Sequence, residues 1–451
     1  MTQLGEAIAR YHRILEADTC RGQAWIEALR GRMQERHLYA GGRPVCPVLR
    51  PHFISRRQYA SMTKAVEMLL SAVERIKQMA LANPALLARL ELLPAEKMLA
   101  SVDPGYSYVA VACLLDAHLQ NGSMHFVGYN ADTPSGVAYG EALADVFLEC
   151  PPVKEFRKKY SLAKTGGTKH LVQALQKVWK EFGGEQRPRI AILEFRQQFQ
   201  TSDSGELVLL KEFFLREGYQ TEIVTPDQLE YRNGALTKGD FRIDLVYRRA
   251  QVEEFLVRFE LTHPLVRAYQ DHAICMVNSF RSELAQKKAI FDLLTDESIT
   301  AGFPAAERKA IRDFVPWTRV VSQRKTTCGC EVVDLVEFIQ KNREKLVLKP
   351  NSSAGDHHSY NGWETDAAGW ERALRTALHM PYVVQSKVDP ILEVFPVSGD
   401  NGLEMRQMVV DVHPLAYLGR MQGCSTWISA AVPSGFTTVA GLAPTFILEA
   451  K

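Results

Sequence analysis

Lys349 has the side chain best placed to do chemistry in this sequence. It follows the apolar residues 346–348 and precedes Pro350, a pattern that predicts a short buried strand ending at the lysine. Residues 351–362 are rich in Asn, Ser and Gly and predict a loop after that strand. An ammonium group presented to such a loop is suited to holding phosphate groups. A surface lysine beside an ordinary turn gives the same local pattern and is the alternative interpretation.

Two oxygen-bearing side chains come from a predicted β-hairpin earlier in the chain. Apolar runs at 108–116 and 124–127 flank an Asn-Gly pair at 121–122, and Asn-Gly between apolar runs is a strong hairpin signal. The hairpin brings Asp116 and Asn130 toward the same end of a sheet, where carboxylate and amide oxygens are ligands that Mg²⁺ accepts. Tight-turn chemistry is the alternative role for Asn130, because turn-forming residues follow it.

The rest of the sequence predicts the elements that position these residues. Residues 1–100 read as mostly helical, and residues 150–185 read as a basic helical linker. A compact α/β unit with a parallel core follows, without the glycine motifs of a dinucleotide fold or a P-loop. The C-terminal part predicts antiparallel strands. The predicted strands are 189–194, 221–224 and 243–247 in the α/β unit, 382–385 after the loop, and 408–412, 416–420 and 437–440 near the C-terminus, with helices through 207–214 and 370–374.

Composition and charge exclude several classes of function. The 451 residues exceed what one hydrophobic core usually supports, so we expect two or three packed units. Lys plus Arg number 54 against 52 Asp plus Glu, and a net charge of +2 creates no field that draws nucleic acid or an anionic membrane. No apolar run is long enough to span a bilayer.

The N-terminal segment and the cysteines predict a location for the protein. The first residues include acidic side chains and lack the apolar core of a signal peptide. The 8 cysteines are scattered along the chain, which favours reduced thiols over a disulfide framework. We therefore expect a cytoplasmic protein, in which Cys328 and Cys330 are spectator thiols in a turn rather than half of a zinc site.

Eight short segments in one consistent order resemble motifs of the circularly permuted ATP-grasp family, of which glutathionylspermidine synthetase is the best-known member. The resemblance extends from about residue 39 to the end of the sequence. Permutation accounts for the order, because the metal-binding strand that ordinarily closes an ATP-grasp domain here precedes the nucleotide lysines. The segments are NADTPSG at 130–136, MVNSF at 276–280, KKAIFDLL at 287–294, PWTRVV at 316–321, VLKPN at 347–351, NGWET at 361–365, YVVQ at 382–385 and the residues around DVHP at 411–414.

The resemblance implies an α/β chain with a circularly permuted ATP-grasp fold, a pre-ATP-grasp α/β domain and an N-terminal helical region. The expected divisions are the helical region at 1–100, the strands of the metal side at 101–150, the linker and pre-ATP-grasp-like domain at 151–255, and the ATP-grasp domain at 256–451 with a lid at about 341–395.

By position in these motifs, the resemblance also implies a site for ATP and Mg²⁺. The two lysines would contact the phosphates or the purine side of ATP, and the strand after the lid helix would line the adenine. For Arg50, a solvent-facing or paired arginine is the alternative to a substrate contact. The residues assigned in this way are Lys288, Lys349, Gln385 and Val388 to the nucleotide, Asp116 and Asn130 to Mg²⁺, and Arg50, Asp132 and Ser135 to substrate.

The implied activity is that of a carboxylate–amine ligase, in which ATP phosphorylates a carboxylate and an amine displaces the acyl phosphate. The substrates would be a small-molecule or peptide carboxylate and an amine. Several positions depart from the family pattern: Leu114, Gly128, Ser386 and Trp427 stand where relatives carry charged residues, and Asp356 adds a negative charge to the phosphate loop. The alternative function is therefore that of a degenerate homologue, which binds a partner without turning over ATP.

Overall fold

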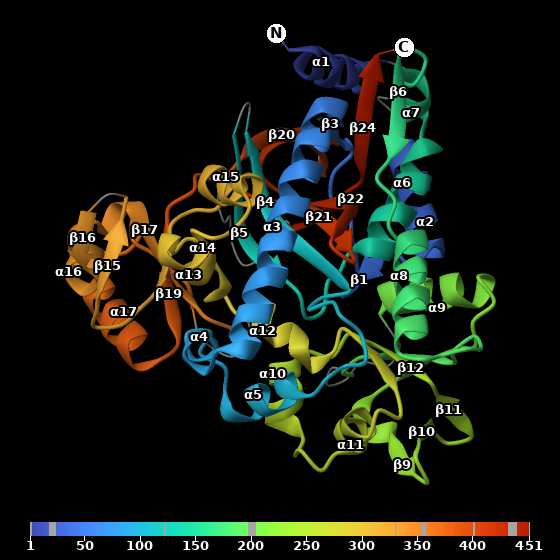
Figure 1. The fold of residues 1–451 in the computed structure, drawn as a ribbon. Helices are drawn as coiled ribbons and strands as arrows, with labels where there is room; N and C mark the ends of the chain where they lie inside the picture. Colours follow the sequence, from blue (N-terminus) through green and yellow to red (C-terminus); the bar gives the residue numbers. More distant parts are fainter. Residues whose placement is uncertain are drawn as a thin grey trace.

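An antiparallel sheet lies at the centre of the molecule, with strands in the order β23-β22-β21-β4-β5 and β20 paired to the first half of β21 (Figure 1). The computed structural model describes residues 2–17, 24–120, 123–196, 204–329, 331–352, 358–399, 402–431 and 440–450. The predicted hairpin is confirmed by the pairing of β4 with β5, and its turn at 121–122 lies outside the described residues. The strands are β4 (Ala112–Gln120), β5 (Ser123–Asn130), β20 (Leu392–Gly399), β21 (Gly402–Tyr417), β22 (Arg420–Ala430) and β23 (Ala440–Ala443).

Strand β4 begins later than the sequence predicts, because the preceding backbone is bonded to side chains. The N–H of Val109 donates to Glu74 Oε1 at 2.8 Å, and the N–H of Val111 donates to Asn278 Oδ1 at 2.8 Å. These donors are therefore not available to a neighbouring strand.

The predicted strand at 416–420 is wrong, because a tight turn interrupts it. Leu418 and Gly419 have φ angles of 50° and 74°, the left-handed pair that a two-residue hairpin turn requires. The turn joins β21 to β22 directly. Of the predicted strand at 437–440, only residue 440 lies among the described residues, where it begins β23.

Helix α3 (Arg56–Ala82) crosses in front of the central sheet (Figure 1) and packs against β21 and β22. It starts at a capping box, in which Ser55 Oγ accepts from the N–H of Gln58 at 3.2 Å and Gln58 Oε1 accepts from the N–H of Ser55 at 2.9 Å. Its apolar face, which includes Val66 and Ile76, is fully buried in the largest hydrophobic cluster. The prediction of a mostly helical N-terminal region is confirmed.

A small sheet joins distant parts of the chain. Strand β24 (Thr445–Ala450) lies between β3 (His52–Ser55) and β6 (Tyr160–Lys164), parallel to the first and antiparallel to the second. The sequence predicts a helical linker at 150–185 and misses β6. A strand of this length is defined by its partner, and its partner lies far away in the sequence.

A parallel sheet confirms the predicted α/β unit. Its strand order is β13-β12-β7-β8, and all neighbouring pairs are parallel. The carboxyl ends of parallel strands share one edge, which is where ligands bind in open α/β sheets. The elements are β7 (Ile190–Leu193), α9 (Gly205–Arg216), β8 (Thr221–Val224), β12 (Leu245–Arg248) and β13 (Cys275–Val277).

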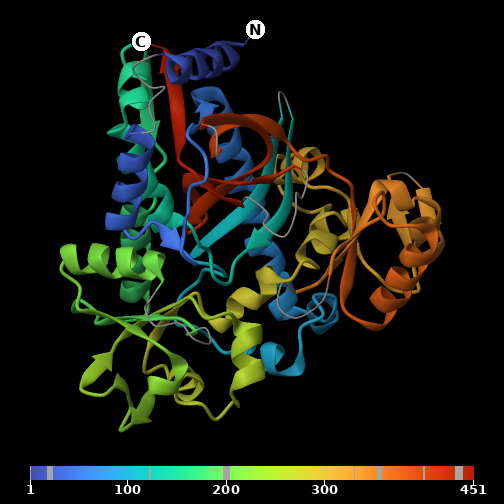
Figure 2. The ribbon, with the colours of Figure 1, turned by 180° about the vertical axis from the view of Figure 1, so that it is seen from behind.

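A separate lobe stands to one side of the rest of the molecule, the body, in Figures 1 and 2. Its antiparallel sheet has the order β14-β19-β17-β18 and encloses a hydrophobic cluster of its own with two helices. We call it the lid lobe. It consists of β14 (Thr318–Val320), the hairpin of β15 (Lys325–Cys328) and β16 (Glu331–Asp334), α16 (Leu335–Lys341), β17 (Leu346–Pro350), β18 (Tyr360–Asn361), α17 (Ala367–His379) and β19 (Tyr382–Ser386).

The remaining elements connect and cover these sheets. They are α1 (Gln3–Glu16), α2 (Ala24–Glu35), β1 (Tyr39–Ala40), β2 (Arg43–Pro44), α4 (Pro84–Ala88), α5 (Pro94–Ser101), α6 (Val137–Leu148), α7 (Pro151–Phe156), α8 (Thr168–Glu181), β9 (Glu230–Arg232), β10 (Ala235–Lys238), β11 (Phe241–Ile243), α10 (Val252–Arg258), α11 (Pro264–Gln270), α12 (Glu283–Gln286), α13 (Ile290–Leu294), α14 (Glu297–Thr300) and α15 (Ala305–Phe314).

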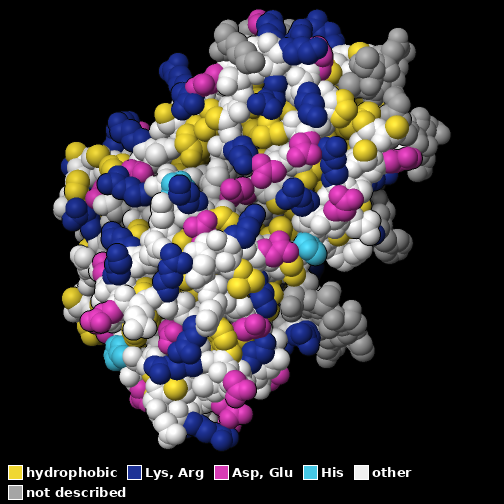
Figure 3. Space-filling model, turned by 90° about the vertical axis from the view of Figure 1, so that its right-hand side faces the viewer, with side chains coloured by type: hydrophobic (Ala, Val, Ile, Leu, Met, Phe, Trp, Pro, Cys, Tyr) yellow, Lys and Arg dark blue, Asp and Glu magenta, His cyan; other side chains and the backbone are white. Residues whose placement is uncertain are grey.

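The surface carries charges of both signs. On the face shown in Figure 3, Lys and Arg side chains are interspersed with Asp and Glu over most of the area. Among the described residues, none of the helices combines the length and the apolar character that crossing a bilayer requires.

Helix α3 gives a test of the core. Ile76→Ala should lower the free energy of unfolding by about 2–5 kcal/mol, because it removes a fully buried side chain and leaves a cavity. Leu81→Ala, at a residue 40% exposed on the same helix, should cost clearly less. Urea denaturation of the two variants measures the difference, and equal losses would contradict this packing.

Candidate functional site

Two lysines from different parts of the chain lie close to one carboxylate. Lys349 is near the end of β17 as predicted, and its Nζ donates to Gln385 Oε1 at 2.8 Å and to the carbonyl of Val127 at 3.2 Å. Lys288 comes just before α13, and its backbone N–H donates to the carbonyl of Asn351 at 2.9 Å. Asn351 follows β17, so the two lysine-bearing segments are fastened to each other.

Electrostatics link the two ammonium groups to each other and to Asp116. Burial lowers the pKa of Lys349 to about 8, with a further lowering by Lys288 and a partial compensation by Asp116. Burial likewise lowers the pKa of Lys288 to about 8, and Asp116 again raises it. Lys349 is thus electrostatically coupled to Lys288, and both lysines to Asp116. Their convergence on one ligand stays a prediction.

The adjacent lysine, Lys287, has a different environment. Its Nζ lies 2.6 Å from Glu96 Oε1 and 3.3 Å from Glu283 Oε2. Burial lowers the pKa of Lys287, but Glu283 and Glu96 outweigh this and raise it above its ordinary value. Lys287 thus has a structural role in a buried ion cluster, whereas the pKa of Lys288 is shifted in the opposite direction.

Asp116 lies over Gly128, the residue opposite it in the hairpin. A Cβ atom at position 128 would be 2.0 Å from Asp116 Oδ2, so any side chain there would displace the carboxylate. The other oxygen, Oδ1, is 3.3 Å from Nε2 of His413 on β21. The Asp116 side chain is 40% exposed, so it remains open to a ligand.

The polar residues of this sheet face continue beyond Asp116. Because side chains alternate along a strand, Asp411 and His413 share one face of β21. His118 bridges the sheet to the segment after β19: its Nε2 is 3.0 Å from Asp411 Oδ1, and its Nδ1 is 3.2 Å from the carbonyl of Asp389. This segment is thereby held against the central sheet.

A pocket of about 390 Å³ opens beside His118 and the end of the lid lobe. Of the residues assigned to the nucleotide, Val388 lines this pocket and Gln385 does not. Gln385 is 2% exposed and joins Lys349 to Thr318, because its Nε2 donates to Thr318 Oγ1 at 3.0 Å. The lining residues are His118, His125, Arg312, Val315, Pro316, Ser386, Lys387, Val388, Asp389 and Ile391.

Asn130 is engaged in its own turn. Its Oδ1 accepts from the N–H groups of Asp132 at 3.2 Å and Thr133 at 3.0 Å, which is the turn chemistry named above as the alternative. Asp132 is 4% exposed; it forms an ion pair with Arg248 and accepts from the N–H of Val252 at 3.2 Å. The two side chains thus hold the loop that follows β5.

The other two residues assigned to substrate have different surroundings. Ser135 is half-buried beside Gly136, the N-cap of α6. Arg50 is fully buried, with its Nη2 2.9 Å from Glu393 Oε2 and its guanidinium 4.0 Å from the ring of Phe395. Burial raises the pKa of Glu393, but His52 and Arg50 lower it overall to about 2. Arg50 is therefore a paired arginine, as the alternative interpretation predicted.

Comparisons with known proteins identify the fold. Neither a family model nor a curated protein matches the sequence. A glutathione synthetase-like effector from Globodera pallida, solved in the apo form, has a similar structure, with a TM-score of 0.56, 11% sequence identity and coverage of 94% of this chain and 96% of that one. The fold is ATP-grasp-like. A chain from Methylobacillus flagellatus with the provisional name gamma-glutamylcysteine synthetase has a TM-score of 0.45, 10% identity and coverage of 87% and 88%.

The ATP-grasp-like fold brings further charged residues to the edge of the parallel sheet that sequence reasoning missed. Glu194 and Arg249 directly follow β7 and β12, at the carboxyl ends of those strands. Burial raises the pKa of Glu194 to about 7, although Arg249 lowers it. Arg249 Nη2 is 3.4 Å from Glu206 Oε2. The signal in the sequence was a charged residue placed directly after a buried apolar strand.

The oxygen-bearing side chains near Asp116 do not form a complete metal site among the described residues. Within the described ranges, no group of three or more His, Cys, Asp or Glu side chains is arranged to hold a metal ion. Asp116 is the carboxylate at the expected position, and the Asn130 oxygen is occupied by its own turn. Mg²⁺ commonly takes one or two protein carboxylates and completes its shell with phosphates and water. A Mg²⁺ ion at Asp116 would therefore need phosphate or water oxygens to complete its shell.

The two lysines should titrate at about pH 8. Asp116→Asn should lower the pKa of both further, because the carboxylate stabilises their ammonium forms. Heteronuclear NMR of lysine-labelled protein, assigned with Lys288→Met and Lys349→Met, measures this. If Lys288 and Lys349 both titrate near the ordinary lysine pKa of about 10.4, the lowering of their pKa values is contradicted.

Arg50 should prove structural when substituted. Arg50→Ala should lower the free energy of unfolding by about 3–5 kcal/mol, because it removes one of the two buried partners of Glu393, Arg50 and His52, and leaves a cavity. Urea denaturation measures the loss. Unchanged stability would return Arg50 to the set of substrate-binding candidates.

Proposed function

We propose that the protein binds ATP between the lid lobe and the central sheet. The adenine would occupy the pocket beside Val388, and the triphosphate would lie against Lys288 and Lys349. The observation that carries this proposal is the convergence of the two lysines, whose lowered pKa values reflect a site where burial opposes the ammonium form. A bound polyanion would favour both ammonium groups.

The chemistry we propose is that of a carboxylate–amine ligase with a circularly permuted ATP-grasp order. The γ-phosphoryl group would pass from ATP to a carboxylate oxygen and release ADP; an amine would then attack the acyl carbon, form the amide and release phosphate. The two lysines would stabilise charge on the transferring phosphoryl group. The position of β4 and β5 ahead of both lysines in the chain supports the permuted order. The carboxylate and amine substrates would bind on the side of Ser135 and the edge of the parallel sheet, where Glu194 and Arg249 lie.

A second function is favoured by the state of the metal side. Gly128 offers no carboxylate, Asp116 is engaged by His413, and Asn130 by its own turn. These features support a degenerate protein that binds ATP or a partner without turnover. The two functions differ in the release of phosphate when candidate carboxylates and amines are supplied.

ATP at about 1 mM should raise the melting temperature, because a ligand that binds the folded state stabilises it. Lys349→Met should abolish the increment, while the matched change Lys341→Met, at a lysine with a side chain 74% exposed, should leave it unchanged. Each variant is compared with and without ATP, so that its own stability cancels. Absence of any shift in the wild type would contradict ATP binding.

The affinity for ATP should fall as the pH rises from about 7 to about 9. Both lysines have pKa values of about 8, so their ammonium forms prevail below that pH and are lost above it. Calorimetric titration across this range measures the change. The titration is repeated with MgCl₂ and with EDTA, in the wild type and in Asp116→Asn. If Asp116 binds Mg²⁺ carried by ATP, MgCl₂ should change the affinity in the wild type more than in the variant. A pH-independent affinity would place the triphosphate away from the lysines.

A further inference from the structure

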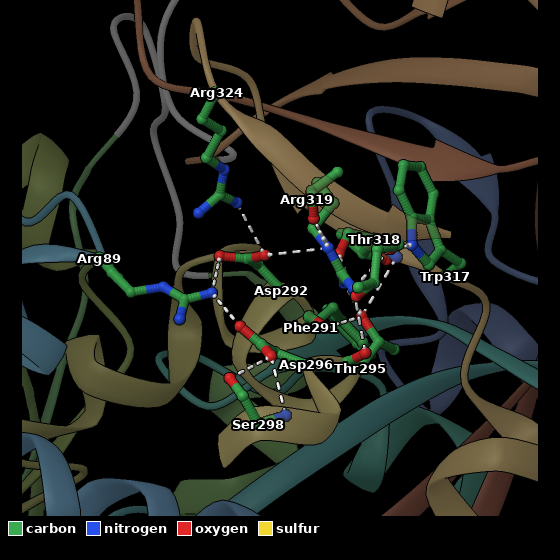
Figure 4. Close-up of polar contacts among 12 residues, drawn as sticks. Arg89, Phe291, Asp292, Thr295, Asp296, Ser298, Trp317, Thr318, Arg319 and Arg324 are labelled. Carbon is green, nitrogen blue, oxygen red and sulfur yellow. Dashed lines mark hydrogen bonds and ion pairs between the residues drawn. The ribbon is translucent and has the colours of Figure 1, made fainter. Parts of the chain in front are cut away.

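A cluster of ion pairs joins the lid lobe to the body close to Lys288. At its centre is Asp292 on α13, which is fully buried and four residues after Lys288 in the sequence. Figure 4 shows its carboxylate between three arginines that approach from different sides. One arginine belongs to the body, and two belong to the lid lobe.

The arginines reach the cluster from two parts of the molecule. From the body, Arg89 Nη2 lies 2.9 Å from Asp292 Oδ2 and 2.9 Å from Asp296 Oδ2. From the lid lobe, Arg324 Nη2 lies 3.1 Å from Asp292 Oδ1, and Arg319 Nε lies 3.9 Å from the same oxygen. The buried Asp292 carboxylate therefore forms ion pairs with arginines from both the body and the lid lobe.

Hydrogen bonds extend from this cluster to Lys349. Arg319 is on β14, where the adjacent Thr318 N–H donates to Thr295 Oγ1 of the body at 3.3 Å. Thr318 Oγ1 accepts from Gln385, and Gln385 accepts from Lys349. On the other side, α13 follows Lys288 directly. The cluster is thus connected to both lysines, one through each part of the molecule.

We propose that Asp292 is a positioning residue: by holding Arg319 and Arg324, it fixes the root of the lid lobe so that Lys349 faces the same anion as Lys288. What the lysines bind rests on the proposed function, but the fastening of the lobe does not. Its loss would let the lid lobe move relative to the body without unfolding either. The backbone N–H groups of Lys288, Ala289 and Thr318 report such movement, because they donate across the junction to Asn351 or Thr295.

Arg324 and Arg89 provide a matched pair of variants. Both bind Asp292, and their side chains are 31% and 27% exposed, but only Arg324 crosses from the lid lobe. We expect Arg324→Gln to speed hydrogen exchange about tenfold at the Lys288, Ala289 and Thr318 amides. Exchange at Val384, which lies inside the lid sheet, should not change. Arg89→Gln should leave all four amides near their wild-type rates, and Arg324→Lys should restore part of the protection because it keeps the charge.

The ATP affinity provides a second readout. Arg324→Gln should raise the dissociation constant of ATP about tenfold through misplacement of Lys349, whereas Arg89→Gln should not. If the wild type fails to bind ATP, the proposed function falls while the exchange experiment still decides the fastening. The inference is overturned if Arg324→Gln leaves the three junction amides protected, speeds Val384 equally, or behaves like Arg89→Gln.

Discussion

The desolvation of two half-buried lysine side chains near Asp116 is the constraint on which the arrangement of the surrounding elements depends. Desolvation disfavours a charged group unless other groups compensate it; Asp116 compensates both lysines in part, and Glu253 also acts on Lys288. The three residues come from the lid lobe, the segment before α13 and the central sheet. Hydrogen bonds between these elements hold them together, including that of the Ala289 N–H to Asn351 and that of Lys349 to the carbonyl of Val127.

The other buried charges differ from this pair in how they are compensated. Lys287 forms ion pairs with glutamates, Arg50 with Glu393, and Arg248 with Asp132. Such pairs are costly to break and gain little from an added ligand. Lys287 and Lys288, adjacent in the chain, differ in the direction of the pKa shift, which is upward for Lys287 and downward for Lys288. Asn278 adds to the framework, because its side chain bonds the start of β4 and the loop after β5.

The sequence predicts those features that depend on local pattern. The strand ending at Lys349, the pairing of β4 with β5, and the parallel core were all readable from apolar runs and turn residues. Features that depend on distant partners could not be predicted in this way. Strand β6 forms because it pairs with β24, and the role of Arg50 is set by its ion pair with Glu393, 343 positions away. The engagement of Asn130 in its turn is local, but the same residue types suit a metal ligand equally well. Sequence alone therefore left both interpretations open.

The position of β24 has a consequence for how the molecule is made. The strand lies in the middle of its sheet, yet both of its neighbours, β3 and β6, are synthesised long before it. At typical rates of translation the earlier strands wait on the order of tens of seconds for their shared partner. Throughout that interval the emerging polypeptide presents two unsatisfied strand edges, which makes the ribosome-bound stage the one most exposed to misassembly and most dependent on chaperones.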